Sequence, residues 1–143
     1  MGGSLSAFMA QNAEKQENIK YVASQRFKED GKPIEWEIRS LTTAEDEAIK
    51  KGCYKTFPVP GKKNQFKREL DTTEYIAKIS AACTVYPNLN DAELQNSYGV
   101  MGSEALLKAM LTPGEYTNYI LKVQEVNGFD VSMDDLVEEA KNL

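Results

Sequence analysis

The chain has 143 residues, of which 41% are hydrophobic and 27% charged, and its formal net charge is −5 at pH 7. This length fits one domain, and the composition is that of an ordinary globular protein. The absence of histidine removes the commonest general base, zinc ligand and activator of a nucleophile, which argues against most hydrolases. The acidic balance argues against nucleic acid as the main partner, because surfaces that bind phosphates are normally basic.

The sequence also predicts a cytoplasmic protein. No apolar run approaches the roughly 18–20 residues that a membrane span needs. The N-terminus lacks the basic start and the continuous apolar stretch of a secretory signal. Cys53 and Cys83 are the only cysteines, and without signs of export they fit a reducing compartment; the alternative is a single disulfide.

The first part of the chain is expected to form a short helix and an antiparallel hairpin. Apolar residues at helical spacing predict an amphipathic helix within residues 5–13. Residues 20–27 and the strictly alternating residues 34–38 then read as two strands. Asp30-Gly31 supplies the turn between them, and the alternation turns Trp36 toward the core.

A short helix that begins with a capping box, and then a second hairpin, are expected next. Residues 42–45 form a capping box, which predicts a short helix that ends at about Lys51. The helical period then disappears over residues 53–70, where we expect a second, weaker hairpin. Pro58 and Pro60 confine its first strand to the edge of a sheet.

Everything after Leu70 is predicted to be helical. Helix start signals stand at residues 71–74, 90–93 and 112–115, and the last of these includes a proline at the first helical position. A final helix is expected to begin near residues 132–135.

These elements are separated along the chain. A β-rich part, about residues 18–70, precedes a cluster of short helices, about residues 71–143, within a single domain spanning residues 1–143. Such a separation of strands from helices defines the α+β class.

The sequence shows no convincing catalytic or metal site. The loop 99–103 is rich in glycine and opens a helix, but a helical segment precedes it and the lysine of a P-loop is missing. Glycines that break a helix for packing are therefore favoured over a phosphate cradle. The acidic pairs at residues 45–47, 134–135 and 138–139 lie in first turns or on polar faces, and none has the spacing of a calcium loop. We predict no enzyme, no metal and no other cofactor.

The distribution of charge is strongly asymmetric. The stretch from Lys50 to Arg68 contains seven cations and no acid, whereas residues 130–139 are strongly acidic. The first interpretation is a solvated loop. The second is a hairpin that binds an acidic protein surface, such as the acidic C-terminal segment of another copy. The seven residues of this basic patch are Lys50, Lys51, Lys55, Lys62, Lys63, Lys67 and Arg68.

Apolar stripes on the predicted helices allow two interpretations. They form the core, or they form a groove of short helices that binds an apolar stripe on a partner helix. Methionine lends such a groove adaptability, and tyrosine combines contact area with a polar tip, as interfaces favour. The candidate partner-binding residues are Met101, Leu106, Leu107, Met110, Tyr116, Tyr119, Ile120 and Val123.

Seven short segments, spread in order along the chain, form a recognisable set. They are Tyr21-Val22-Ala23-Ser24, Trp36-Glu37-Ile38-Arg39, Val59-Pro60-Gly61-Lys62, Tyr86-Pro87-Asn88-Leu89-Asn90-Asp91, Tyr98-Gly99-Val100-Met101-Gly102, Met110-Leu111-Thr112-Pro113-Gly114-Glu115-Tyr116 and Asn127-Gly128-Phe129-Asp130. Together they closely resemble the XkdN-like phage tail assembly chaperones, and the similarity is collinear from about Leu5 to the C-terminus. None has a specific chemistry, but seven in one order are hard to attribute to chance.

The resemblance implies a non-structural chaperone that works in the cytoplasm of the bacterial host and is absent from the mature virion. It would bind the tape measure protein, keep it soluble, and be displaced as tail tube proteins polymerise. It also implies a longer form made by programmed frameshifting, and Ala140-Lys141-Asn142 can be encoded by a slippery sequence. Self-association is a further expectation. The alternative function is a small structural tail component or adaptor protein of the virion.

Overall fold

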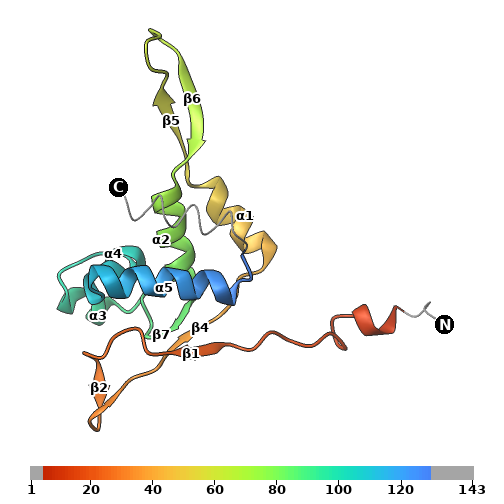
Figure 1. Ribbon diagram of the computed structural model, residues 1–143, viewed down its shortest axis with the longest axis vertical. Helices are drawn as coiled ribbons and strands as arrows, with labels where there is room; N and C mark the ends of the chain where they lie inside the picture. The colour runs from red at the N-terminus through yellow and green to blue at the C-terminus, as the bar shows by residue number, and fades with distance from the viewer. Residues whose placement is uncertain (1–4, 130–143) are drawn as a thin grey trace.

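The strict alternation of residues 34–38 produces the central strand of the protein. The computed structural model describes residues 5–129 and places β4 (Trp36–Ile38) in the middle of a three-stranded antiparallel sheet (Figure 1). Trp36 and Ile38 are buried, while Glu37 between them is partly covered. The inward orientation of Trp36 is therefore confirmed.

The strand β1 (Ile19–Tyr21) pairs with β4 in an antiparallel manner, with Tyr21 opposite Trp36. This pairing confirms the first predicted hairpin, but its first strand is much shorter than the predicted residues 20–27. Beyond Tyr21 the chain leaves the sheet, and two residues on each side of the turn form a separate small ladder. Its strands are β2 (Lys28–Glu29) and β3 (Lys32–Pro33), with positive φ angles of 54° at Asp30 and 77° at Gly31.

The third strand, β7 (Thr84–Tyr86), corrects the prediction that everything after Leu70 is helical. It pairs with the free side of β4, and the Arg39 N–H donates to the Cys83 carbonyl at 2.9 Å. The three residues are β-branched or aromatic and so suit a strand. A run of three residues is too short to show a period, so no strand could be predicted there from the sequence.

Two capping boxes fix the starts of helices, as predicted. α1 (Thr43–Lys51) begins after Thr42, and α5 (Pro113–Val126) begins after Thr112. In each box the threonine side chain accepts from the backbone three residues later, and the glutamate there accepts from the threonine N–H. The end of α1 at Lys51 also agrees with the prediction.

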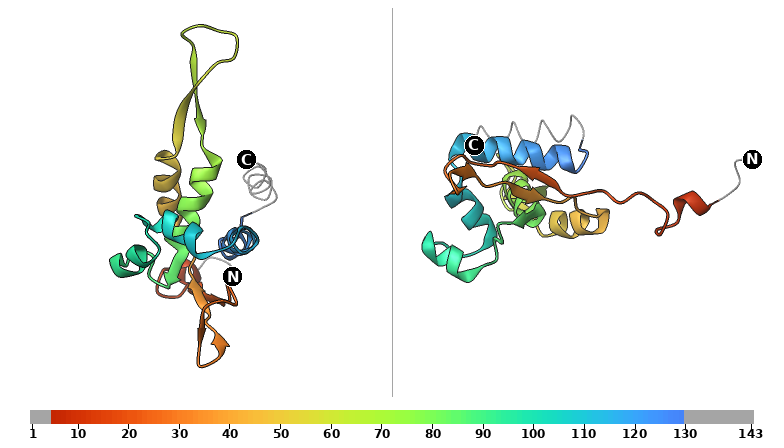
Figure 2. Two further views of the ribbon diagram at one scale, coloured as in Figure 1. Left: turned by 90° about the vertical axis from the view of Figure 1, so that its left-hand side faces the viewer. Right: turned by 90° about the horizontal axis from the view of Figure 1, so that it is seen from below.

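The helix α2 (Thr72–Cys83) is the element around which the others pack. It contacts α1, α5, β7 and α4 (Ser103–Met110), and Figure 2 shows it between α1 and α5. α3 (Ala92–Ser97) lies on the connection to α4. Asp71 caps α2 through its side chain, as the start signal at residues 71–74 predicts. The cap of α3 is Asp91, one residue after the first position of the predicted start signal at residues 90–93.

The second predicted hairpin is present and projects away from the rest of the molecule (Figures 1 and 2). β5 (Tyr54–Pro58) pairs with β6 (Phe66–Leu70) in a separate two-stranded sheet, so both of its strands are edge strands. From Tyr54 to Glu69 every residue is exposed except Val59, which is partly buried. The hairpin therefore adds almost nothing to the core.

The hydrophobic core lies between the inner face of the three-stranded sheet and the helices. Trp36 and Tyr119 meet edge to face in it, with ring centroids 5.3 Å apart. Cys53 and Cys83 are buried and free, so the disulfide alternative is wrong. None of the described helices is both long and apolar enough to cross a bilayer. The helix predicted to begin near residues 132–135 lies outside the described residues.

Candidate partner-binding surfaces

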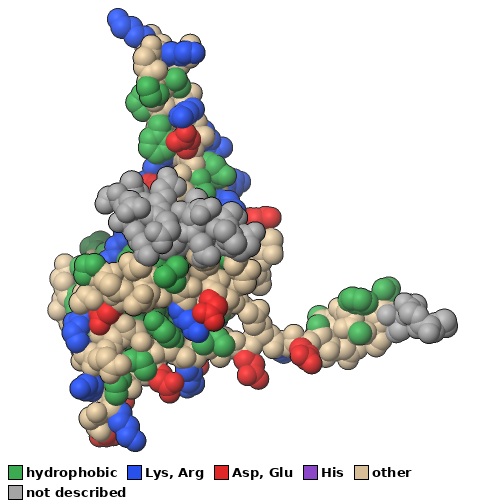
Figure 3. Space-filling view, viewed as in Figure 1, with side chains coloured by type: hydrophobic (Ala, Val, Ile, Leu, Met, Phe, Trp, Pro, Cys, Tyr) green, Lys and Arg blue, Asp and Glu red, His purple; other side chains and the backbone are tan. Residues whose placement is uncertain are grey.

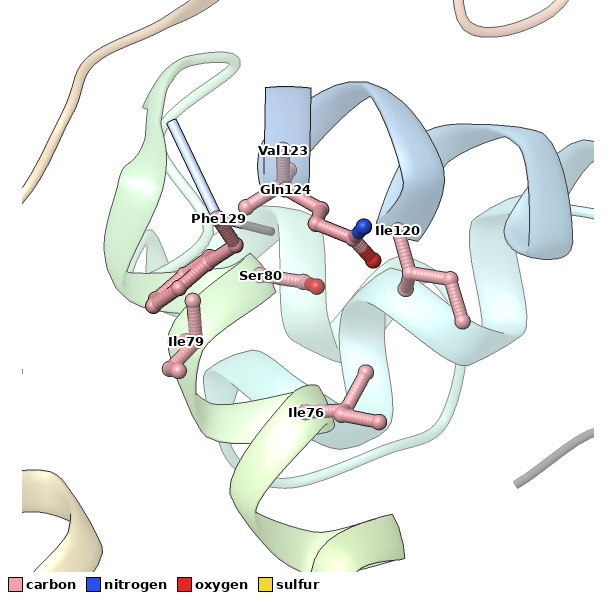
Figure 4. Close-up of a pocket in the computed structure, with 7 residues that line it drawn as sticks. All are labelled: Ile76, Ile79, Ser80, Ile120, Val123, Gln124 and Phe129. Carbon is pink, nitrogen blue, oxygen red and sulfur yellow. The ribbon is translucent and has the colours of Figure 1, made fainter. Parts of the chain in front are cut away.

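The recess between α2 and α5 is lined mainly by apolar side chains. Figure 4 shows its lining, which comes from α2, α5 and the residue Phe129. Only two lining residues, Ser80 and Gln124, have polar side chains, and neither is a titratable group. Within residues 5–129 there is also no cluster of three or more cysteines and acids that could hold a metal ion. The remaining lining residues are Ile76, Ile79, Ile120 and Val123.

Six of the eight candidate partner-binding residues lie in the core. They belong to the inner faces of α4 and α5, both of which pack against α2. In this conformation the apolar stripes face inward and offer no groove wall to a partner, so the core interpretation describes them. The six buried residues are Leu106, Leu107, Met110, Tyr119, Ile120 and Val123.

The burial of Tyr119 shows how firmly this face is fixed. Its ring packs on Trp36, and its centroid lies 6.1 Å from that of Tyr21. Its hydroxyl is 2.6 Å from the Thr84 hydroxyl, which in turn donates to the Ser80 carbonyl. Burial raises the pKa of Tyr119 far above its ordinary value. Such a side chain cannot turn outward without breaking the link between α5 and β7.

The other two candidates remain accessible to a partner. Tyr116 is half-buried at the rim of the core. Met101 lies in the loop between α3 and α4 and is 91% exposed. Partner binding at these two positions stays a prediction.

The seven basic residues lie at the end of α1 and along the hairpin β5–β6. Figure 3 shows Lys and Arg side chains over the hairpin, with a cluster at its far end. Two are neutralised locally: Lys55 binds Asp71 and Glu74 at 3.0 and 2.8 Å, and Lys67 binds Glu69 at 2.7 Å. Lys50, Lys51, Lys62, Lys63 and Arg68 form no ion pair with any other residue that the structure describes.

Exposed aromatic side chains accompany these cations, a feature that the sequence did not reveal. Tyr54 and Phe66 are 40% and 64% exposed. The guanidinium of Arg68 lies 5.0 Å from the centroid of the Tyr54 ring, within the range of a cation–π contact. Pro58 and Pro60 were the available signal, because prolines confine a strand to the edge of a sheet, where it has a neighbouring strand on one side only.

The N-terminal arm, residues 5–18, is the second surface that sequence analysis missed. An amphipathic helix buries its apolar side, but here only Ser6–Phe8 form a short 3-10 helix, η1. Leu5, Phe8 and Met9 are exposed, and all residues from 5 to 20 are solvent-accessible. Figures 1 and 2 show the arm extending away from the sheet.

Comparison with known proteins identifies the family. The model of the phage XkdN-like tail assembly chaperone proteins matches residues 5–141. The chain belongs to this family. The resemblance inferred from seven sequence segments is thereby confirmed. Membership in a family of tail assembly chaperones indicates that the partners belong to the class of phage tail assembly proteins.

Two relatives from Bacillus subtilis (strain 168) match this tail assembly chaperone over nearly its full length. YqbN is 32% identical over 142 residues, which covers 96% of this chain and 93% of YqbN. The phage-like element PBSX protein XkdN is 31% identical over 140 residues, with the same coverage of both chains. The crystal structure of YqbN has a TM-score of 0.75 at 28% identity and covers 89% of this chain and 98% of that one.

Proposed function

We propose that this tail assembly chaperone binds the tape measure protein in the cytoplasm of the bacterial host and keeps it soluble while the tail tube assembles. It acts by contact alone, without catalysing a reaction, and it leaves before the virion is mature. The tail tube protein displaces it. Family membership supports the general role, and the exposed arm supports a role in binding.

The arm carries the proposal because its apolar tip has no place in the core. Leu5 and Phe8 are 70% and 81% exposed. The base of the arm is held by the Gln16 side-chain amide, which donates to the Val126 carbonyl at 2.8 Å. Contiguous apolar surface that stays in water typically marks a site for another protein. A long helical partner with apolar stripes fits a short apolar segment presented in this way.

Co-expression with the tape measure protein of the same phage or prophage tests the proposal. The unmodified chain is expected to yield a soluble complex that is recovered in a pull-down. The double variant Leu5→Ser and Phe8→Ser should recover much less tape measure protein, because its apolar contact area is removed. The matched control, Gln11→Ser and Glu14→Ser, changes two polar residues of the same arm and should bind as the unmodified chain does.

Equal recovery with both double variants would remove the arm from the interface. If the unmodified chain forms no complex, the experiment is repeated with the longer frameshifted form. The codons for Ala140-Lys141-Asn142 show whether the gene contains the slippery sequence that this form requires. Failure with both forms would contradict tape measure binding. Detection of the chain in purified particles would instead favour a structural component or adaptor of the virion.

A further inference from the structure

The hairpin β5–β6 contains cations that its own carboxylates do not neutralise. Lys55 and Lys67 are paired, as described above, and both are directed toward acids of the same region. Lys62 and Lys63 lie at the turn, and Arg68 lies on β6; among residues 5–129 none of the three has a carboxylate within ion-pair distance. The distal hairpin therefore has a net positive charge in a protein that is acidic overall.

One face of the hairpin combines such a cation with aromatic surface. Directly opposed residues of an antiparallel pair share a face, and Thr56 opposes Arg68 while Pro58 opposes Phe66. Tyr54, two residues before Thr56, lies on this same face and contacts Arg68. A partner that fits this face must present acidic and apolar side chains together.

The chain itself contains such a partner sequence. Residues 130–139, Asp-Val-Ser-Met-Asp-Asp-Leu-Val-Glu-Glu, hold five acids, no cation and four apolar residues. Opposite charges over this length favour association, and like charges elsewhere on the acidic chain disfavour other docking positions. The apolar residues of the segment match the exposed rings of Tyr54 and Phe66.

The geometry favours the segment of a second copy over that of the same chain. Residue 130 follows the end of α5, where the Asn127 side chain accepts from the Leu41 N–H at 2.8 Å, close to the start of α1. The hairpin begins at the opposite end of α1 and projects beyond it (Figure 1). Its tip at Lys62 lies about 40 Å from that start, given ~1.5 Å per residue along α1 and ~3.3 Å per residue from Tyr54 to Lys62. Ten residues span at most ~36 Å even when fully extended, so residues 130–139 of the same chain would fall short of this tip.

We propose that the hairpin face of Tyr54, Phe66 and Arg68, together with Lys62 and Lys63 at its tip, binds residues 130–139 of a second copy of this chain. The contact is head-to-tail, because one surface of each copy meets a different surface of the next. The proposal is independent of tape measure binding, since it concerns the chaperone alone.

Sedimentation velocity of the purified full-length chain, at ~50 mM and ~500 mM salt, tests this contact. Self-association is expected at low salt and should weaken at high salt, because exposed charges are screened within a few ångströms there. The hairpin variant Lys62→Glu, Lys63→Glu, Arg68→Glu should associate about tenfold more weakly or worse. The tail variant Asp134→Lys, Asp135→Lys, Glu138→Lys should show the same loss.

Mixing the two variants is the decisive step. The reversed hairpin of one now complements the reversed tail of the other, so heterologous association should return. The matched control Lys28→Glu, Lys32→Glu, Lys108→Glu makes the same charge change on other exposed elements and should associate about as well as the unmodified chain. Far-UV circular dichroism confirms that each variant is folded.

The proposal fails if the unmodified chain stays monomeric at low salt, or if mixing the variants restores nothing. A chain ending at Phe129 gives a second test that does not depend on charge reversal, and it too must lose self-association. Binding of a homopolymeric RNA by the hairpin, with self-association unchanged in the hairpin variant, would assign the cations to nucleic acid and overturn the proposal.

Discussion

Met101 and Met110 are close in sequence but lie in opposite environments. Met110 belongs to the inner face of α4 and is 4% exposed, whereas Met101 precedes that helix and is 91% exposed. Both were candidates for the same binding groove. A methionine is compatible with either environment because its side chain is flexible and polarisable, so composition alone does not separate them.

Substitution by aspartate should separate the two methionines. Met110→Asp places a carboxylate without a partner in the core and should cost about 4 kcal/mol or more, enough to unfold many domains. Met101→Asp should change the free energy of unfolding by no more than about 0.5 kcal/mol. Urea unfolding followed by circular dichroism measures both. Equal stability of the two variants would show that α4 does not pack as described.

At the scale of elements, the glutamate of each capping box pairs with an arginine that comes before the helix in the chain. Hydrogen bonds from Arg39 and from the Thr42 N–H lower the pKa of Glu45 to about 2. At α5, the Thr112 N–H, together with an ion pair to Arg26, lowers the pKa of Glu115 to about 2. Both carboxylates are solvent-accessible, so each contributes modestly to stability.

These two glutamates predict a loss of stability in acid. A glutamate in the unfolded chain has a pKa near 4.3, so between about pH 5 and pH 2 the unfolded state binds more protons. Stability is therefore present above that window and decreases as the pH falls through it. Glu45→Gln with Glu115→Gln should flatten the dependence of the urea midpoint on pH, and Glu93→Gln, an exposed control, should not. Parallel curves for both variants would contradict the assignment.

At the scale of the whole molecule, the protein consists of a packed body with an arm and two hairpins projecting from it (Figures 1 and 2). The body contains the three-stranded sheet and the helices around α2. The projections contribute few buried residues, and they carry exposed apolar and aromatic side chains together with Lys62, Lys63 and Arg68. The buried residues that stabilise the fold and these exposed side chains thus lie largely in different parts of the chain.

This separation predicts that the long hairpin can be removed without loss of the fold. Replacing residues 56–68 with Asn-Gly keeps Lys55 and Glu69 and provides a two-residue turn of the kind that hairpins favour. The free energy of unfolding should change by no more than about 1 kcal/mol, because surface changes have small effects. Thermal unfolding measures this, and sedimentation should show that self-association is lost. A collapse of the fold would mean that the hairpin stabilises the body.

Local signals in the sequence determined much of the fold. The alternation around Trp36, the capping boxes at Thr42 and Thr112, and the aspartate cap of α2 appear in the structure where they were predicted. Each depends on contacts between residues at most four apart, or on one face of a single element, so neighbouring residues suffice to specify them. The family was also recognisable from the order of short segments.

Only the tertiary structure decided which apolar residues are buried and which stay exposed. The stripes on α4 and α5 are buried because α2 packs against both helices. The apolar residues of the arm and of the long hairpin stay exposed because none of the elements within residues 5–129 covers them. β7 likewise exists as a strand because the free edge of β4 pairs with it. A periodic pattern reports that a face is apolar, but what covers that face is fixed by residues far away in the chain, through packing that no local signal contains.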